Sequence, residues 1–229
     1  EQTSSEITAN YKAKQVEGES LIDLTGGFGI DSFFFAEQFK EVTHYEINEE
    51  LSKIANHNFQ QLSPNGNIKF YSGNGIDYLQ HSDKVFDWIY IDPSRRNEIG
   101  GRVFRLQDCE PDILHYLDLL LKHSHNGILM KTSPLLDLSL GLKELNFQVE
   151  EIQVIAVNNE VKELLWKITS ANNESQLPFT CVNFNKGKKE VFQADFYAED
   201  TVEINYNKPL HYLYEPNSAI LKAGFFKFG

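Results

Sequence analysis

The chain has 229 residues, of which 41% are hydrophobic, and no apolar run approaches the roughly 20 residues that cross a bilayer. A folded globular protein with no membrane partner is therefore expected. The formal charge of −12 at pH 7 argues against strong nonspecific binding to nucleic acid, although a local basic patch is compatible with it. Two isolated cysteines, Cys109 and Cys181, and an N-terminus without a secretion signal predict a reducing, cytoplasmic location. Because the only methionine is Met130, we expect a fragment of a longer protein.

Apolar runs bounded by turn residues alternate with segments of helical period. This alternation predicts an α/β fold with a mostly parallel sheet, ending in an antiparallel hairpin at Asn158-Asn159. The expected helices are 3–14, 31–39, 49–62, 77–81, 110–123 and 135–145. The expected strands are 21–25, 42–46, 68–71, 86–91, 127–131, 149–157 and 161–168, followed by β-rich pieces at 179–184 and 191–197.

A polar stretch, Ser170–Gln176, separates the α/β pattern from a shorter β-rich tail. Linkers of this composition commonly lie between domains. We therefore predict a ligand-binding domain over residues 1–171 and a small, incomplete accessory domain over residues 172–229.

The run from Leu21 to Gly29 has the pattern of a buried strand that enters a glycine turn and then a helix. Backbone amides in such a turn can approach a ligand closely, which predicts a nucleotide-type cradle; an ordinary tight turn is the alternative. A dinucleotide site requires Gly or Ala where Ser32 stands, so the pattern disfavours NAD. Glu46 closes the next strand 23 residues after Asp23, near the spacing at which an acid binds ribose hydroxyls.

The most apolar strand, Phe86–Ile91, ends at Asp92-Pro93. Open α/β sheets bind ligands at the carboxyl ends of their strands, so we expect the reacting groups here. The following loop is rich in arginine, which either contacts an anionic or polynucleotide substrate or pairs with acids nearby. No cluster of His, Cys and carboxylates has zinc spacing, so no metal is expected. The arginines are Arg95, Arg96, Arg102 and Arg105.

Several of these stretches resemble a bacterial family of class I S-adenosylmethionine-dependent methyltransferases with a C-terminal THUMP-like domain. The tail phrase Tyr212–Gly224 resembles the THUMP-like segment, so the likeness spans nearly the whole chain. It implies a Rossmann-like methyltransferase sheet for residues 1–171 and a THUMP-like domain for residues 172–229, which either handles RNA or merely packs against the fold. The other matching stretches are Glu1–Glu6 with Tyr11-Lys12-Ala13, Asp23–Asp31, and Asp92–Arg96 with Arg102-Val103-Phe104.

The resemblance implies that S-adenosylmethionine binds in the glycine turn. Asp23 would lie near the methionine end, Glu46 would bind the ribose, and Ile47 and Asn74 would lie beside the adenine. The family usually has Asp where this chain has Asn74, so a simple Gly-Asn-Gly turn is the alternative. The segment 2–11 is expected to be a lid over the cofactor or a packed helix. The cofactor-binding residues are predicted to be Asp23, Thr25, Gly26, Gly27, Phe28, Gly29, Asp31, Glu46, Ile47, Asn74 and Gly75.

The acceptor site is predicted to comprise Asp92, Pro93, Ser94 and Arg95. This run resembles the Asp/Asn-Pro-Pro-aromatic motif of amino methyltransferases and the Asp-Pro-Pro-Arg motif of RNA uridine methyltransferases, but Ser94 replaces the second proline. Neither cysteine lies in a catalytic motif, so direct transfer aligned by Asp92 is expected. RNA (tRNA or rRNA), contacted through Arg95–Arg105, is the first predicted acceptor. A small-molecule or protein acceptor, or cofactor binding without turnover, remain the alternatives.

Overall fold

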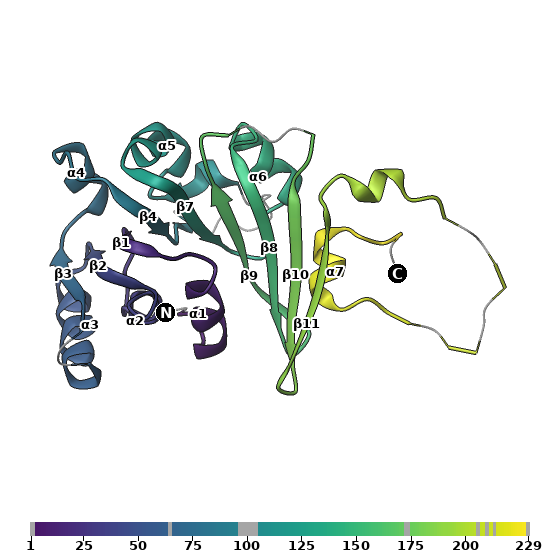
Figure 1. The fold of residues 1–229 in the computed structure, drawn as a ribbon, viewed down its shortest axis with the longest axis horizontal. Helices are drawn as coiled ribbons and strands as arrows, with labels where there is room; N and C mark the ends of the chain where they lie inside the picture. The colour runs from purple at the N-terminus through teal and green to yellow at the C-terminus, as the bar shows by residue number, and fades with distance from the viewer. Residues whose placement is uncertain are drawn as a thin grey trace. The chain divides into compact units, whose positions relative to one another are not determined.

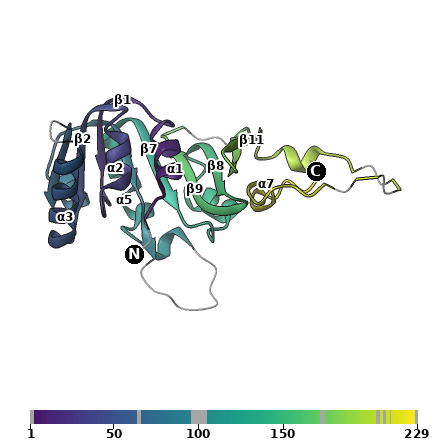
Figure 2. The same ribbon diagram turned by 90° about the horizontal axis from the view of Figure 1, so that it is seen from below.

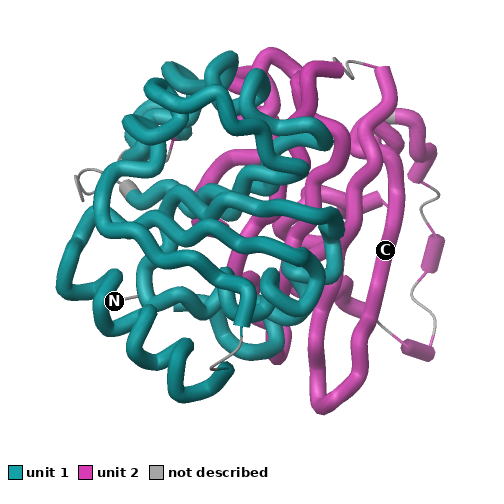
Figure 3. Tube along the Cα trace, turned by 60° about the vertical axis from the view of Figure 1, so that its left-hand side comes forward, with its two compact units in different colours: residues 1–99, 106–131 teal, residues 100–105, 132–229 magenta. Residues whose placement is uncertain are grey.

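The computed structural model describes residues 3–63, 66–95, 105–171, 175–204, 207–208, 211–212 and 214–227. The chain divides into two compact units, which Figure 3 shows in different colours. Unit 1 comprises residues 1–99 and 106–131, and unit 2 comprises residues 100–105 and 132–229.

Unit 1 is built on a parallel sheet with the strand order β3-β2-β1-β4-β7. The chain adds strands outward from β1 to β3 and then returns to the other side of β1 for β4. Such a reversal opens a crevice at the carboxyl ends of β1 and β4, where open α/β sheets bind ligands. The strands are β1 (Gly18–Asp23), β2 (Phe39–Glu46), β3 (Ile68–Ser72), β4 (Phe86–Ile91) and β7 (Ser124–Thr132).

Helices cover both faces of this sheet. Figure 1 shows α1, α2 and α3 on one side and α4 and α5 on the other, and Figure 2 shows the first group from below. Four of these five helices have an N-cap residue whose side chain accepts a backbone N–H of the first turn. These residues are Ser5, Asn48, Asn74 and Asp112. The helices are α1 (Glu6–Ala13), α2 (Ile30–Phe35), α3 (Glu49–Leu62), α4 (Gly75–Gln80) and α5 (Ile113–Lys122).

The expected helix over residues 31–39 is too long. Helix α2 ends at Phe35, and Phe39 already belongs to β2, where it pairs in register with Gly18 of β1. Phe35 and Phe39 are both buried and lie edge to face, with 6.4 Å between ring centroids. Strand pairing and burial of Phe39 therefore override the helical pattern of the sequence.

A short ribbon of unit 1 follows β4. β5 (Ser94–Arg95) pairs antiparallel with β6 (Cys109–Glu110), and the 3-10 helix η1 (Leu106–Asp108) precedes β6. Ser94 lies opposite Glu110 in this pairing. The ribbon therefore brings the residues before α5 to the end of β4.

Unit 2 contains a sheet in which β8 pairs antiparallel with β9 and parallel with β10, and β10 pairs antiparallel with β11. The predicted hairpin is confirmed, and Asn158 and Asn159 make its turn with φ of 50° and 62°. Because β10 joins β8, the predicted boundary at 171/172 lies inside unit 2, and the division into domains at that point stays a prediction. The elements are α6 (Leu138–Glu144), β8 (Val149–Val157), β9 (Glu160–Ile168), β10 (Pro178–Asn185), β11 (Lys188–Asp195), the 3-10 helix η2 (Ala198–Thr201) and α7 (Ser218–Ala223).

Each unit has its own apolar core. Tyr90 and Phe35 lie 4.9 Å apart in unit 1, while in unit 2 the buried Trp166 donates its indole N–H to Thr132 Oγ1 at 2.9 Å. No helix among the described residues is long and apolar enough to cross a membrane.

Candidate functional site

A cavity of about 470 Å³ lies in unit 1, lined mostly by residues at and after the carboxyl ends of its strands and also by two residues that precede α1. Its size is within the usual range for small-molecule sites. Gly29, Gly75 and Pro93 do not line it, and the side chain of Arg95 lies outside the described part of the chain. The predicted site residues that line it are Asp23, Thr25, Gly26, Gly27, Phe28, Asp31, Glu46, Ile47, Asn74, Asp92 and Ser94.

The glycine turn between β1 and α2 is fixed by close packing as well as by backbone conformation. A Cβ at Gly26 would lie 2.1 Å from Nε2 of His44, so no larger residue fits there without moving that ring. Gly27 and Gly29 adopt φ of 55° and 78°, a region that favours glycine. Burial lowers the pKa of His44, which keeps this packing group neutral.

Glu46 bridges the turn and the next strand. Its Oε2 accepts the N–H of Gly27 at 2.9 Å, and its Oε1 accepts the N–H of Asn48 at 2.8 Å. These two contacts hold the carboxylate at the cavity wall, where each oxygen keeps a further lone pair for a ligand hydroxyl. Ile47 follows it with 75% of its surface exposed.

Asp23 is buried beneath the turn, with 1% of its surface exposed. Its carboxylate accepts the hydroxyl of Ser32 at 2.6 Å and the N–H of Thr25 at 3.0 Å. Burial raises the pKa of Asp23 to about 7, and these two hydrogen bonds oppose that rise. Ser32, the residue that disfavours a dinucleotide site in the sequence, thus has another role here: it donates a hydrogen bond to Asp23.

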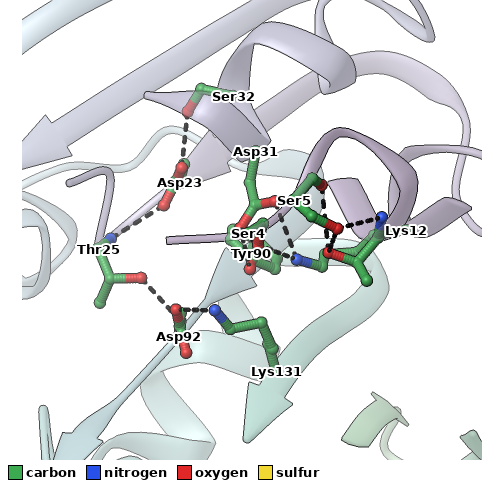
Figure 4. A network of polar contacts seen from close by, with 11 residues as sticks. Ser4, Ser5, Lys12, Asp23, Thr25, Asp31, Ser32, Tyr90, Asp92 and Lys131 are labelled. Atoms are coloured by element: carbon green, nitrogen blue, oxygen red, sulfur yellow. Dashed lines mark hydrogen bonds and ion pairs between the residues drawn. The ribbon is translucent and has the colours of Figure 1, made fainter. Parts of the chain in front are cut away.

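Asp31 fastens the N-terminal helix to the cavity wall (Figure 4). It pairs with Lys12 of α1 at 2.9 Å and accepts hydroxyls from Ser4 at 3.0 Å and Tyr90 at 2.7 Å. Burial alone would raise the pKa of Asp31, but the charges of Lys12 and Lys131 with the hydrogen bonds from Lys12 and Tyr90 lower it overall. The side chain of Lys12 is fully buried.

Residues before α1 form part of the cavity wall. Thr3 and Ser4 line the cavity, and Ser4 also accepts a hydrogen bond from Lys12 Nζ at 2.8 Å. The segment therefore contributes to the site as well as to packing. A lid that opens and closes stays a prediction.

The far side of the cavity holds an ion pair between Asp92 and Lys131 (Figure 4). The backbone N–H of Asp92 donates to Thr25 Oγ1 at 2.7 Å, which ties the end of β4 to the glycine turn. Burial raises the pKa of Asp92, and the charge and hydrogen bond of Lys131 oppose that rise. Ser94 also lines this side, and its hydroxyl lies 3.5 Å from the carbonyl oxygen of Glu110.

Asn74 lines the cavity and is also the N-cap of α4, where its Oδ1 accepts the N–H of Ile76 at 2.9 Å. The side-chain amide of Asn74 therefore caps a helix, and its contact with adenine stays a prediction. Gly75 is a packing residue, because a Cβ there would lie 2.7 Å from Leu24.

Several wall residues were not predicted from the sequence. Lys131 is the most important, and a signal for it existed: it closes the expected strand 127–131 in the same way that Asp92 follows strand 86–91. Arg96 and Arg102 lie outside the described residues, and Arg105 is exposed. No group of three or more His, Cys, Asp and Glu side chains in the described ranges is arranged to hold a metal. The missed wall residues are Leu24, Ile30, Gly73, Tyr90, Glu110, Pro111 and Lys131, whereas Thr3 and Ser4 belong to the segment 2–11 that was expected to be a lid or a packed helix.

Comparison with known proteins adds to this geometry. No family model matches the sequence. Over 99 residues the chain is 33% identical to an uncharacterized RNA methyltransferase of Mycoplasma mobile, a match that covers 43% of this chain and 27% of that protein. The crystal structure of a proposed methyltransferase from Porphyromonas gingivalis W83 has a TM-score of 0.87 and 33% identity, covering 99% of this chain and 57% of that one.

The chain has the fold of the class I methyltransferases. A tRNA (uracil-54, C5)-methyltransferase of Pyrococcus abyssi, solved with S-adenosyl-L-homocysteine, has the same fold at a TM-score of 0.52 and 19% identity, covering 71% of this chain and 37% of that one. The predicted fold class is confirmed. The chain spans little more than half of the Porphyromonas protein and about a quarter of the Mycoplasma protein. The THUMP-like assignment of the tail stays a prediction.

Proposed function

We propose that the cavity of unit 1 binds S-adenosylmethionine and that the chain is a methyltransferase, which transfers the methyl group of this cofactor to an acceptor. The observation that carries the proposal is the charge of the cavity wall. Five of its lining residues are Asp or Glu, and one is Lys. Such a wall favours a ligand with sulfonium and ammonium groups and disfavours the pyrophosphate of a dinucleotide.

The wall residues divide by the part of the cofactor that each would hold. Glu46 would accept the ribose hydroxyls, with Ile47 and Asn74 beside the adenine. Asp31, whose lowered pKa keeps it ionised, would face the ammonium group at the methionine end, with Asp23 shaping the turn beneath. When bound, the cofactor supplies an electrophilic methyl group. Asp92 and Ser94 would then line the place where the acceptor meets it.

RNA is the acceptor class that we propose, as tRNA or rRNA. The Mycoplasma relative and the Pyrococcus structural neighbour are both RNA methyltransferases by description, which supports this choice. In unit 2, Tyr212 and Tyr214 are 78% and 82% exposed, and exposed aromatic rings are suited to stacking on bases. RNA contact through the Arg95–Arg105 loop and the THUMP-like tail is part of the same proposal.

Methyl transfer tests the proposal directly. The chain is incubated with S-adenosylmethionine labelled in the methyl group and, separately, with tRNA, rRNA, protein and small-molecule fractions. The proposal predicts label in an RNA fraction, and binding of that RNA that weakens steeply with salt. Label only in protein or small molecules would overturn the RNA acceptor. Cofactor binding without label in any fraction would favour a binding module without turnover.

A further inference from the structure

We propose, resting on the methyl transfer proposed above, that Lys131 is a positioning residue that holds the Asp92 carboxylate toward the cavity, where it accepts an N–H or O–H of the methyl acceptor. The acceptor atom is accordingly an uncharged nitrogen or oxygen.

The pair is built by the register of two central strands. Ile91 lies opposite Met130 in the parallel pairing of β4 with β7, so the next residues, Asp92 and Lys131, meet side by side. Both line the cavity, with 32% and 14% of their side chains exposed. Thr25 fixes the backbone of Asp92 from the other side. The carboxylate of Asp92 is therefore held in position while one side of it faces the cavity.

The charges around Asp92 explain why a lysine is needed. The carboxyls of Asp31 on α2 and Asp23 at the end of β1 face the same space, and both disfavour a further negative charge. Lys131 on β7 and Lys12 on α1 oppose them. Lys12 is already committed to Asp31 and Ser4, so Lys131 is the cation paired with Asp92 itself.

The reaction that this arrangement serves needs no covalent enzyme intermediate. An acceptor N–H or O–H donates to the Asp92 carboxylate, which turns the lone pair of that atom toward the methyl carbon. The new bond to carbon forms as the carbon–sulfur bond breaks, its electrons pass to sulfur, and the acceptor proton passes to Asp92.

The same wall excludes other acceptors. Methylation at C5 of a pyrimidine requires an added nucleophile such as a thiolate, and neither Cys109 nor Cys181 lines the cavity. A carboxylate or phosphate acceptor would meet the acidic wall and be repelled. The wall therefore selects a neutral group with a hydrogen to donate.

The test follows the Asp92 carboxyl by carbon-13 NMR across pH, with its signal assigned from Asp92→Asn. The free chain is used, so neither cofactor nor acceptor is needed. In Lys131→Met we expect the pKa of Asp92 to rise, and in Lys131→Arg we expect it to stay near the wild-type value. Lys69→Met, which removes another ion-paired lysine of unit 1 away from the cavity, is the matched control. An unchanged titration in Lys131→Met overturns the inference.

Kinetics on the RNA fraction that the wild type methylates give the second arm. The inference predicts that the acid limb of the kcat profile moves to higher pH in Lys131→Met and returns in Lys131→Arg, with KM for the cofactor unchanged. A uniform loss of activity at every pH would mean a merely structural role and overturns it. Failure of wild-type chain to bind S-adenosylmethionine overturns the proposed function instead, whatever the NMR arm shows.

Discussion

The two sides of the cavity are built in different ways. On the side of β1 and β2, backbone N–H groups and carboxylates satisfy one another over short stretches, as with Thr25 and Asp23. On the side of β4 and β7, two charged side chains meet only because distant strands lie in register, as with Asp92 and Lys131. The first side is suited to holding a ligand in one place, whereas the second is suited to proton transfer. Changes on the first side should therefore affect stability and binding, and changes on the second should affect turnover.

The largest expected effect lies beneath the first side, at Asp23. Its pKa rises from the ordinary 3.8 to about 7 because it is buried. Because the pKa is raised in the folded state, the folded protein holds this proton more tightly than the unfolded chain does. The contribution of Asp23 to the free energy of unfolding is therefore fully present below about pH 4 and is lost as the pH rises through 7. Relative to Asp23→Asn, the wild type should lose about 4 kcal/mol between pH 4 and pH 8. Urea unfolding across this range measures the difference.

Asp77→Asn, at an exposed position on α4, controls for the amide substitution itself. If the difference between wild type and Asp23→Asn stays flat with pH, the burial argument for Asp23 fails.

The second side should show the opposite pattern. Asp92→Asn cannot take the acceptor proton, so kcat should fall by about 100-fold or more, since general-base contributions usually start at about that size. Affinity for the cofactor should stay similar, because Asp92 acts on the acceptor. Initial rates at saturating cofactor and a calorimetric titration measure the two quantities. A variant that binds cofactor much more weakly at full kcat would reverse the assignment of the two sides.

Gly26→Ala tests the packing of the turn. The added methyl would overlap the ring of His44, and overpacking of this kind costs about 1–3 kcal/mol. Replacing His44 by Ala in the same chain removes the obstacle, so the double variant should be less destabilised than the sum of the singles. Urea unfolding of the four proteins gives the coupling. If the destabilisations of the two single variants simply add in the double variant, the turn accommodates the methyl group without contacting His44, and the packing argument is wrong.

The side that depends on short stretches of sequence is also the side that the sequence predicted best. Asp23 and Glu46 are the last residues of β1 and β2, so their place at the strand ends could be predicted from local pattern and spacing. The position of Lys131 at a strand end could be predicted in the same way, but its pairing with Asp92 could not, because that pairing depends on the register of β4 against β7. Tyr90 looked like an ordinary core residue of an apolar strand, yet its hydroxyl donates to Asp31 across 59 positions of sequence.

The α/β class and the order of elements followed from periodicity, but some boundaries did not. Helix α2 ends early because Phe39 pairs and packs in β2, which is a tertiary effect. The expected strand 127–131 begins three residues earlier, at Ser124, because Phe86 of β4 pairs with that residue.

The most direct test of the central claim is a calorimetric titration of the chain with S-adenosylmethionine, beside Glu46→Gln and the surface control Glu41→Gln. The amide keeps the shape of the Glu46 side chain but loses one of its two acceptor oxygens and the charge that strengthens hydrogen bonds to ribose hydroxyls, so affinity should fall about tenfold, or about 1.4 kcal/mol. The account predicts that wild type and Glu41→Gln bind alike and that Glu46→Gln binds more weakly. No binding by folded wild-type chain, or equal binding by all three, would contradict it.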